Sequence, residues 1–229
     1  MSPDEGHTVH ESTAGPDELN RLVRDVSQEL AIDSEFLFGL LRLDDWSFVI
    51  QLHALVEAAV THLLVHSTRE GRLQTFYQRL ALQNERTGKL AVVSALELLE
   101  PWHIRHIKAL SGLRNRLAHD IRMVSFSLSD DIADDSRADE FVGQFSGGSI
   151  GEKDRPSWRP ILRRDPKFFV WMQAIIVTGH VYLSATRARI ARDVTQLKVD
   201  QGMAVDGLLA AIRDSVERTG ELTFRRKGT

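Results

Sequence analysis

The stretch Leu110–Asp120 reads Leu-Ser-Gly-Leu-Arg-Asn-Arg-Leu-Ala-His-Asp and decides our prediction of the fold. Leucines at 110, 113 and 117 recur at helical spacing, so we expect a helix with one apolar face turned to a core. Arg114, Asn115 and His119 lie off that face. The other segments read as helices that could bury the leucines, so the sequence predicts a protein built around this helix.

Composition limits the class of protein. The chain has 229 residues, of which 42% are hydrophobic, enough to build a core. The absence of cysteine fits a reducing cytosol, and the polar segment Met1–Gly15 has no apolar signal core. No apolar run approaches about 18 residues, which predicts no membrane span and a cytoplasmic location. The net charge of −3 means that any phosphate-binding surface must be local.

Helix signals follow one another along the chain. Pro16 suits the first helical position, and Asp44 or Asp45 can cap a core helix over roughly Trp46–His66. A long helix is expected from about Asp165, its far end available to a second subunit. A last amphipathic helix is expected to end before Gly220. Because no internal repeat appears, we predict an all-α bundle.

We divide the chain into a disordered arm over residues 1–15, a single helical domain over 16–219 and a flexible basic tail over 220–229. Within the domain, residues 129–167 are acidic and then rich in Gly and Ser. We expect them to form a long surface connection with one helical turn at Ala138–Phe145. Just before them, Val124–Leu128 could be extended.

The side chains of the opening stretch suit a phosphate group. His119 can take or give a proton near neutral pH, and Arg114 presents a planar fork of donors for phosphate oxygens. Asn115 could orient the histidine or donate to the same oxygen. In a straight helix Arg114 and His119 point apart and are separated by roughly 7–8 Å of rise. A working pair therefore needs the helix to end near His119, or a second copy of the motif across a symmetric interface.

The alternative interpretation is that these side chains only stabilise the fold. Asn115 and His119 could fasten the helix end to the next segment, and Arg114 could pair with Glu57. We include Glu57 and Asp120 as supporting residues of the candidate site. Glu57 sits at the edge of the apolar stripe of its helix, where a carboxylate can be solvated or can reach a cation on a neighbouring helix.

A second basic region surrounds Trp158. A nucleic-acid surface is one interpretation of its arginines, and a solvated face with Trp158 packed inward is the favoured one. The candidate nucleic-acid-binding residues are Arg155, Arg159, Arg163 and Arg164.

No cofactor or metal is predicted. His103, His106 and His119 do not share metal-like spacing with carboxylates on one face. Gly147-Gly148 matches no phosphate-binding loop, and no serine carries a nucleophile-elbow signature.

The run Arg114-Asn115-Arg116-Leu117-Ala118-His119 resembles the signature of the HEPN superfamily, an Arg, a polar residue, three further residues and a His. Thr87-Gly88-Lys89-Leu90, the approach Ile107–Leu113 and Val124-Ser125-Phe126 resemble the mannitol operon repressor branch of that superfamily. This resemblance implies an all-helical, usually dimeric protein. It covers about Asp44–Asp130 plainly and the helix from Phe168 more loosely.

Two functions follow from the resemblance. The repressor branch implies a regulatory dimer that binds a protein partner, such as an antitoxin or regulator, or a nucleic acid. The wider superfamily includes metal-independent endoribonucleases of toxin and defence systems. In such an enzyme Arg114 and His119 would be the catalytic pair, with Asn115 assisting.

Overall fold

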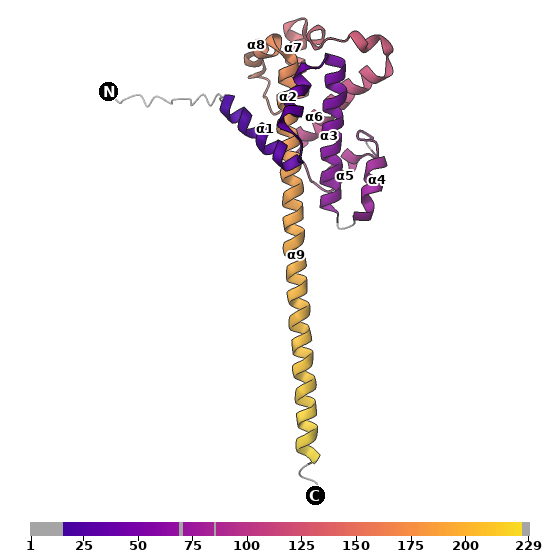
Figure 1. Cartoon of the computed structure of the whole chain (residues 1–229), viewed down its shortest axis with the longest axis vertical. Helices are drawn as coiled ribbons and strands as arrows, with labels where there is room; N and C mark the ends of the chain where they lie inside the picture. The colour runs from indigo at the N-terminus through magenta and orange to yellow at the C-terminus, as the bar shows by residue number, and fades with distance from the viewer. Residues whose placement is uncertain (1–15, 69–70, 85, 226–229) are drawn as a thin grey trace, which may run out of the picture. The chain divides into compact units, whose positions relative to one another are not determined.

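The computed structural model describes residues 16–68, 71–84 and 86–225, so the predicted arm over 1–15 lies outside the described residues. The described chain is all-α and contains no strand, which confirms the predicted class. Its helices are α1 (Pro16–Leu30), α2 (Ser34–Gly39), α3 (Asp45–Ser67), α4 (Gln74–Arg79), α5 (Lys89–Ala95), α6 (Pro101–His119), α7 (Asp135–Phe145), α8 (Arg155–Arg164) and α9 (Pro166–Arg225) (Figure 1). Short 3-10 helices are η1 (Leu40–Arg42), η2 (Gly71–Leu73), η3 (Ile121–Ser125) and η4 (Leu128–Ile132).

Aspartate caps start two of these helices, and one of them, Asp44, was predicted. The side chain of Asp44 accepts a hydrogen bond from the Ser47 amide at 2.9 Å at the start of α3. Asp33 accepts one from the Glu35 amide at 2.9 Å at the start of α2. Each carboxylate satisfies an amide that the first helical turn leaves without a partner.

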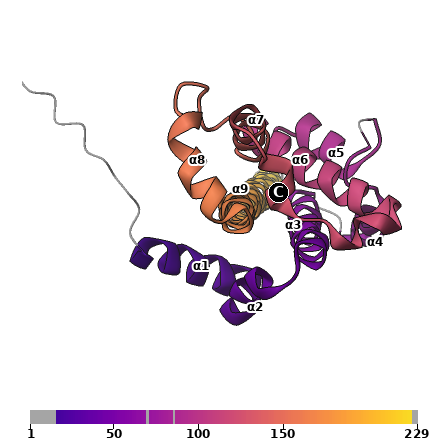
Figure 2. The ribbon, with the colours of Figure 1, turned by 90° about the horizontal axis from the view of Figure 1, so that it is seen from above.

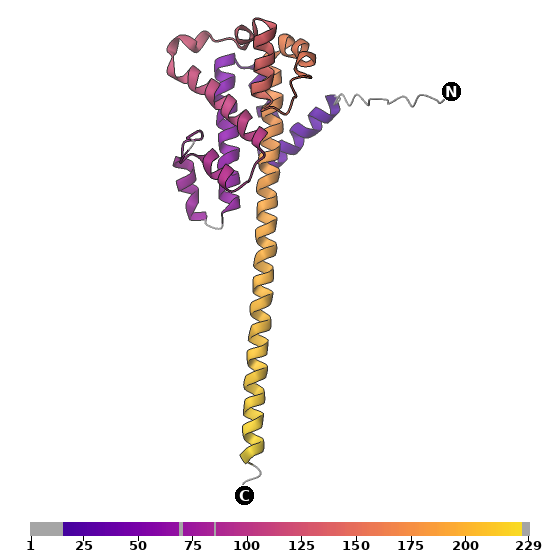
Figure 3. The ribbon, with the colours of Figure 1, turned by 180° about the vertical axis from the view of Figure 1, so that it is seen from behind.

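The chain divides by its internal contacts into two units, residues 1–185 and 186–229. Among the residues whose side chains are described, all the buried core residues belong to the first unit. Its core forms between α3, α6 and the first part of α9. Figure 2 shows α3 and α9 end-on, with α1 and α2 on one side of α9 and α7 and α8 on the other. Figure 3 shows the same unit from behind, where α4 and α5, both in contact with α3, are in view.

Two anchors join the start of α9 to the N-terminal helices. Trp171 is fully buried and donates from Nε1 to the Leu37 carbonyl oxygen at 2.8 Å. Asp45, the first residue of α3, pairs with Lys167 Nζ at 2.9 Å and accepts the Leu128 amide at 2.8 Å. Asp45 therefore holds three segments that are far apart in the sequence.

The second unit, residues 186–229, is described as far as Arg225 and is the continuation of the α9 helix. Its large apolar side chains are exposed where they are described, among them Ile190, Val194 and Leu197. The single domain predicted over 16–219 therefore spans two units. The α9 helix continues through Gly220, so the prediction of a separate last helix was wrong. Of the predicted tail over residues 220–229, only 226–229 lie outside the described residues.

The region after α6 differs from the prediction. Val124–Leu128 is not extended, because most of it belongs to η3 and η4. The segment 129–167 contains α7, an eleven-residue helix, and α8, a ten-residue helix, and these two pack against each other. Asp134 caps α7 by accepting the Arg137 amide at 2.9 Å. The predicted surface connection is thus helical and forms one wall of the first unit.

Two helices are long and apolar enough to cross a membrane by length and composition, Asp45–Ser67 and a stretch within Pro166–Gly207. More than half of each apolar window is buried in the structure, 56% and 61%. The core helices of soluble proteins share this property, so the prediction of a cytoplasmic location remains a prediction.

Candidate functional site

The side chains of Arg114, Asn115 and His119 all come from helix α6. The N-cap of this helix is Glu100, whose backbone amide donates to His103 Nδ1 at 3.1 Å in a capping box, and the helix ends at His119. Its buried face carries Ile107, Leu110, Leu113 and Leu117. Arg114 and Asn115 lie on the flank of this face and are half-buried, and His119 is exposed at the last turn.

A chain of polar contacts fixes the arginine. Arg114 Nη1 donates to Asn115 Oδ1 at 3.0 Å, and Asn115 Nδ2 donates to Gln83 Oε1 at 3.2 Å. Gln83 Nε2 in turn donates to the Lys108 carbonyl oxygen at 2.8 Å. Among the described residues Arg114 has no further hydrogen bond and no ion pair. The remaining N–H groups of its guanidinium are therefore available to a ligand.

These residues line a pocket of about 380 Å³ between α3, α6 and the segment that precedes α5. Its lining comprises His53, Glu57, Ala81, Leu82, Gln83, Asn84, Ser111, Arg114 and Asn115. Three predicted site residues, Arg114, Asn115 and Glu57, are thus brought together. His119 and Asp120 are not part of the lining.

Glu57 pairs with Lys89, not with Arg114. Lys89 Nζ lies 2.6 Å from Glu57 Oε1, and the Lys89 side chain is only 3% exposed. The alternative in which Arg114 is a structural partner of Glu57 is therefore wrong for this structure. Since Glu57 and Lys89 compensate each other, the positive charge of Arg114 is left unbalanced in the pocket.

His53 and Ser111 are pocket residues that were not predicted from the sequence. His53 Nε2 lies 3.1 Å from Ser111 Oγ, and His53 Nδ1 lies 4.0 Å from Glu57 Oε2. Burial lowers the pKa of His53, Glu57 opposes this change, and the charges of Arg114 and Lys89 lower the pKa further. The imidazole is thus neutral near pH 7 and adds no charge to the pocket. The four-residue spacing of His53 and Glu57 along α3 was the available signal, but nothing in the sequence pointed to Ser111.

His119 and Asp120 lie apart from the pocket. His119 is exposed and has no hydrogen bond or ion pair with another described residue. Asp120 accepts the Arg122 amide at 3.0 Å and pairs with the Arg122 guanidinium at 2.8 Å, which lowers the pKa of Asp120. Within one chain, then, the motif does not unite the arginine with its histidine, although the helix ends at His119 as one predicted route to a working pair required.

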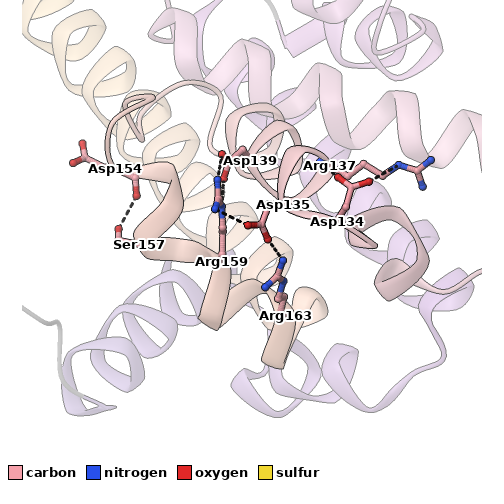
Figure 4. A network of polar contacts seen from close by, with 8 residues as sticks. All are labelled: Asp134, Asp135, Arg137, Asp139, Asp154, Ser157, Arg159 and Arg163. Carbon is pink, nitrogen blue, oxygen red and sulfur yellow. Dashed lines mark hydrogen bonds and ion pairs between the residues drawn. The ribbon is translucent and has the colours of Figure 1, made fainter.

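The second predicted region, the arginines of α8, is largely neutralised by α7. Figure 4 shows Arg159 and Arg163 directed at carboxylates of α7. Arg159 donates to Asp139 Oδ1 at 2.6 Å and to Asp135 Oδ2 at 2.9 Å, and Arg163 pairs with Asp135.

The other two arginines of this group differ from each other. Arg155 is half-buried against Gly143, where a Cβ atom would come within 2.8 Å of Arg155 Cζ. Arg164 is exposed and has no ion pair with a described residue. Trp158 packs against Phe169 with ring centroids 5.8 Å apart. This arrangement corresponds to the favoured interpretation of a solvated face with an inward tryptophan.

No group of three or more His, Cys, Asp or Glu side chains among the described residues is arranged to hold a metal ion. Comparisons of the chain with protein-family models, with curated proteins and with solved structures found no match.

Proposed function

We propose that this protein is a regulatory binding module, related to the mannitol operon repressor branch of the HEPN superfamily, that acts as a dimer and holds a phosphate group of its partner in the Arg114 pocket. The observation that carries the proposal is the half-buried Arg114, which has one hydrogen bond and no carboxylate partner among the described residues. An arginine fixed by Asn115 in a pocket is pre-organised, so little entropy is lost when it binds an anion.

The charges around Arg114 favour an anion over a neutral ligand. Lys89 and Glu57 compensate each other and His53 is neutral, which leaves the pocket with the charge of one guanidinium. A planar guanidinium recognises phosphate and carboxylate oxygens through paired N–H donors. A pocket of about 380 Å³ has the size of a small-molecule site and would admit one phosphate with its sugar, not a duplex. We therefore favour single-stranded RNA as the first partner to test.

The test is fluorescence anisotropy with a labelled single-stranded RNA oligonucleotide. Arg114→Ala should weaken binding about tenfold or more, because a charge-assisted bidentate contact is lost. Arg122→Ala is the matched control, since Arg122 is exposed and outside the pocket. Equal affinity of the wild type and Arg114→Ala would overturn the proposal, provided that circular dichroism shows both to be folded.

The second candidate is a metal-independent endoribonuclease. It is favoured by His119, which is exposed at the end of α6 without a described partner and could serve a second copy of the chain. In this function Arg114 of one copy would hold the phosphate while the 2′-hydroxyl of the RNA attacks its phosphorus atom. The bond from phosphorus to the 5′-oxygen of the next nucleotide would break, and His119 of the other copy would transfer the proton to that oxygen.

Incubation with single-stranded and structured RNA in the presence of chelator distinguishes this candidate. The wild type should cleave, and His119→Ala and Arg114→Ala should not. Equal loss of RNA with all three proteins would reject the enzyme and attribute the loss to a contaminant.

A further inference from the structure

The helix of the second unit carries a seam of apolar residues whose described side chains are exposed. Between Ile190 and Leu208 apolar side chains recur at alternating spacings of four and three, interrupted once by a glutamine. The seam comprises Ile190, Val194, Leu197, Gln201, Ala204 and Leu208. Ile190, Val194 and Leu197 are 55%, 45% and 61% exposed. This is the seven-residue pattern of a coiled coil, with Ile190 and Leu197 at d and Val194 and Gln201 at a.

The helix needs such a partner for its own stability. Gly202 and Gly207 lie within it with no side chain or backbone within 4 Å of a Cβ at either position. Each glycine costs about 1 kcal/mol relative to alanine in a helix. Most helices in proteins are stabilised by packing of an apolar face, and the large apolar side chains described in this segment are exposed.

The charges beside the seam indicate that the partner helix belongs to a second copy of this chain, in parallel orientation. Asp193 and Asp200 occupy g positions and Lys198 an e position. In a parallel pair a g residue faces the e residue of the next heptad in the other helix, so Asp193 of each copy meets Lys198 of the other. In an antiparallel pair the g positions face each other, and the aspartates would repel.

Gln201 fixes the register of such a pair. At an a position the amide of each copy faces the same amide of the other and can exchange hydrogen bonds with it. A shifted pair would bury Gln201 against an apolar side chain and leave its polar atoms unsatisfied. A lipid bilayer is a poorer partner, because Arg192, Asp193 and Lys198 occur within this stretch.

We infer that two copies of this chain associate through a parallel, in-register coiled coil over about residues 190–208. The inference does not depend on the Arg114 pocket, so either proposal can fail alone.

Cysteine cross-linking of the full chain tests it cleanly, because the native sequence contains no cysteine. Ile190→Cys and Leu197→Cys, prepared separately, should each give a disulfide-linked dimer under mild oxidation. Val199→Cys is the matched control, since Val199 is 49% exposed and lies on the outer face of the helix, at f. Cross-linking at only one of positions 190 and 197 would indicate an antiparallel pair, and equal yields at all three would indicate random collision. Either result overturns the inference.

Light scattering provides the second measurement. The wild type and Val199→Asp should have the mass of a dimer, and Leu197→Asp should have that of a monomer because it places two charges in the seam. A monomeric wild type at all concentrations would contradict the inference, including the case in which the protein instead binds lipid vesicles.

Discussion

At the scale of single residues, Lys89 is a buried cation whose charge is compensated by one carboxylate. Its side chain is 3% exposed and lies 2.6 Å from Glu57. Removing one member of a buried pair leaves a charge uncompensated, which costs more than removing both.

We therefore expect Lys89→Met and Glu57→Gln each to reduce the free energy of unfolding by about 1–3 kcal/mol, with the larger value for Glu57→Gln. The double variant should lose less than the sum, by about 1 kcal/mol. Urea unfolding of the four proteins measures this coupling. Strictly additive losses would show that the pair is not coupled.

Two buried histidines predict how stability depends on pH. Burial lowers the pKa of His103 and of His106 to about 4, from an ordinary value of 6.5. Both rings are neutral in the folded chain at pH 7, and Nε2 of each is buried without a partner among the described residues. Between pH 6.5 and 4 the unfolded chain binds protons that the folded chain does not, so the free energy of unfolding falls as the pH falls.

Above pH 6.5 these two histidines should therefore add no pH dependence to the free energy of unfolding. Below pH 6.5 the free energy of unfolding should decrease, by an amount on the order of 3 kcal/mol for each histidine at pH 4. Urea midpoints measured from pH 7 to 4.5 test this. His106→Gln should flatten the curve relative to the wild type, whereas the exposed His119→Gln should leave it unchanged. A midpoint independent of pH would refute the buried neutral state.

At the scale of elements, the contact between α7 and α8 combines charge with packing. Arg159 bonds to two aspartates of α7, and its side chain is 26% exposed. These arginines serve the fold in our account, and they do not form the RNA surface.

Arg159→Ala should lower the melting temperature and leave RNA affinity unchanged. Arg164→Ala, at an exposed position of the same helix, should change neither. Thermal unfolding measures the stability of each variant, and fluorescence anisotropy measures its RNA affinity. If Arg159→Ala weakened RNA binding without loss of stability, the nucleic-acid interpretation of this region would be restored.

Sequence patterns predicted the elements that carry their own signals. Asp44 and the long apolar stripe predicted α3, and the leucines at 110, 113 and 117 predicted α6. Residues 129–167 gave weaker signals, because α7 begins among acidic residues that resemble a loop and α8 contains Pro160 within ten residues. The break expected before the last helix was wrong, because Gly202 and Gly207 are tolerated inside a continuous helix.

The candidate site was predictable to the extent that it lies on one helix. Arg114 and Asn115 are adjacent in sequence, and the edge position of Glu57 was visible. The pairing of Glu57 with Lys89 instead of Arg114, and the contact of His53 with Ser111, depend on how α3, α5 and α6 pack. Side chains from different helices meet through tertiary geometry, which periodicity does not encode.

At the scale of the whole molecule, the two units differ in how they are stabilised. Among the described residues, every buried core side chain lies at or before Ala185, whereas the large apolar side chains described after it are exposed. The first unit therefore contains its own core, and we propose that the second is stabilised by association.

A chain truncated after Ala185 should unfold cooperatively, with a melting temperature within a few degrees of the corresponding transition of the full chain, and should be monomeric. Calorimetry and light scattering test this. An unfolded fragment would show that the core requires residues 186–229, and a dimeric fragment would place the association in the first unit.

The most direct measurement of the central claim is a titration with inorganic phosphate, followed through the imidazole proton resonance of His53 and assigned with His53→Gln. The account predicts a saturable shift of this resonance in the wild type and in Arg122→Ala, none in Arg114→Ala, and no shift of the exposed His180. No response of His53 in the wild type, or an equal response in Arg114→Ala, would contradict the claim that Arg114 and its pocket bind an anion.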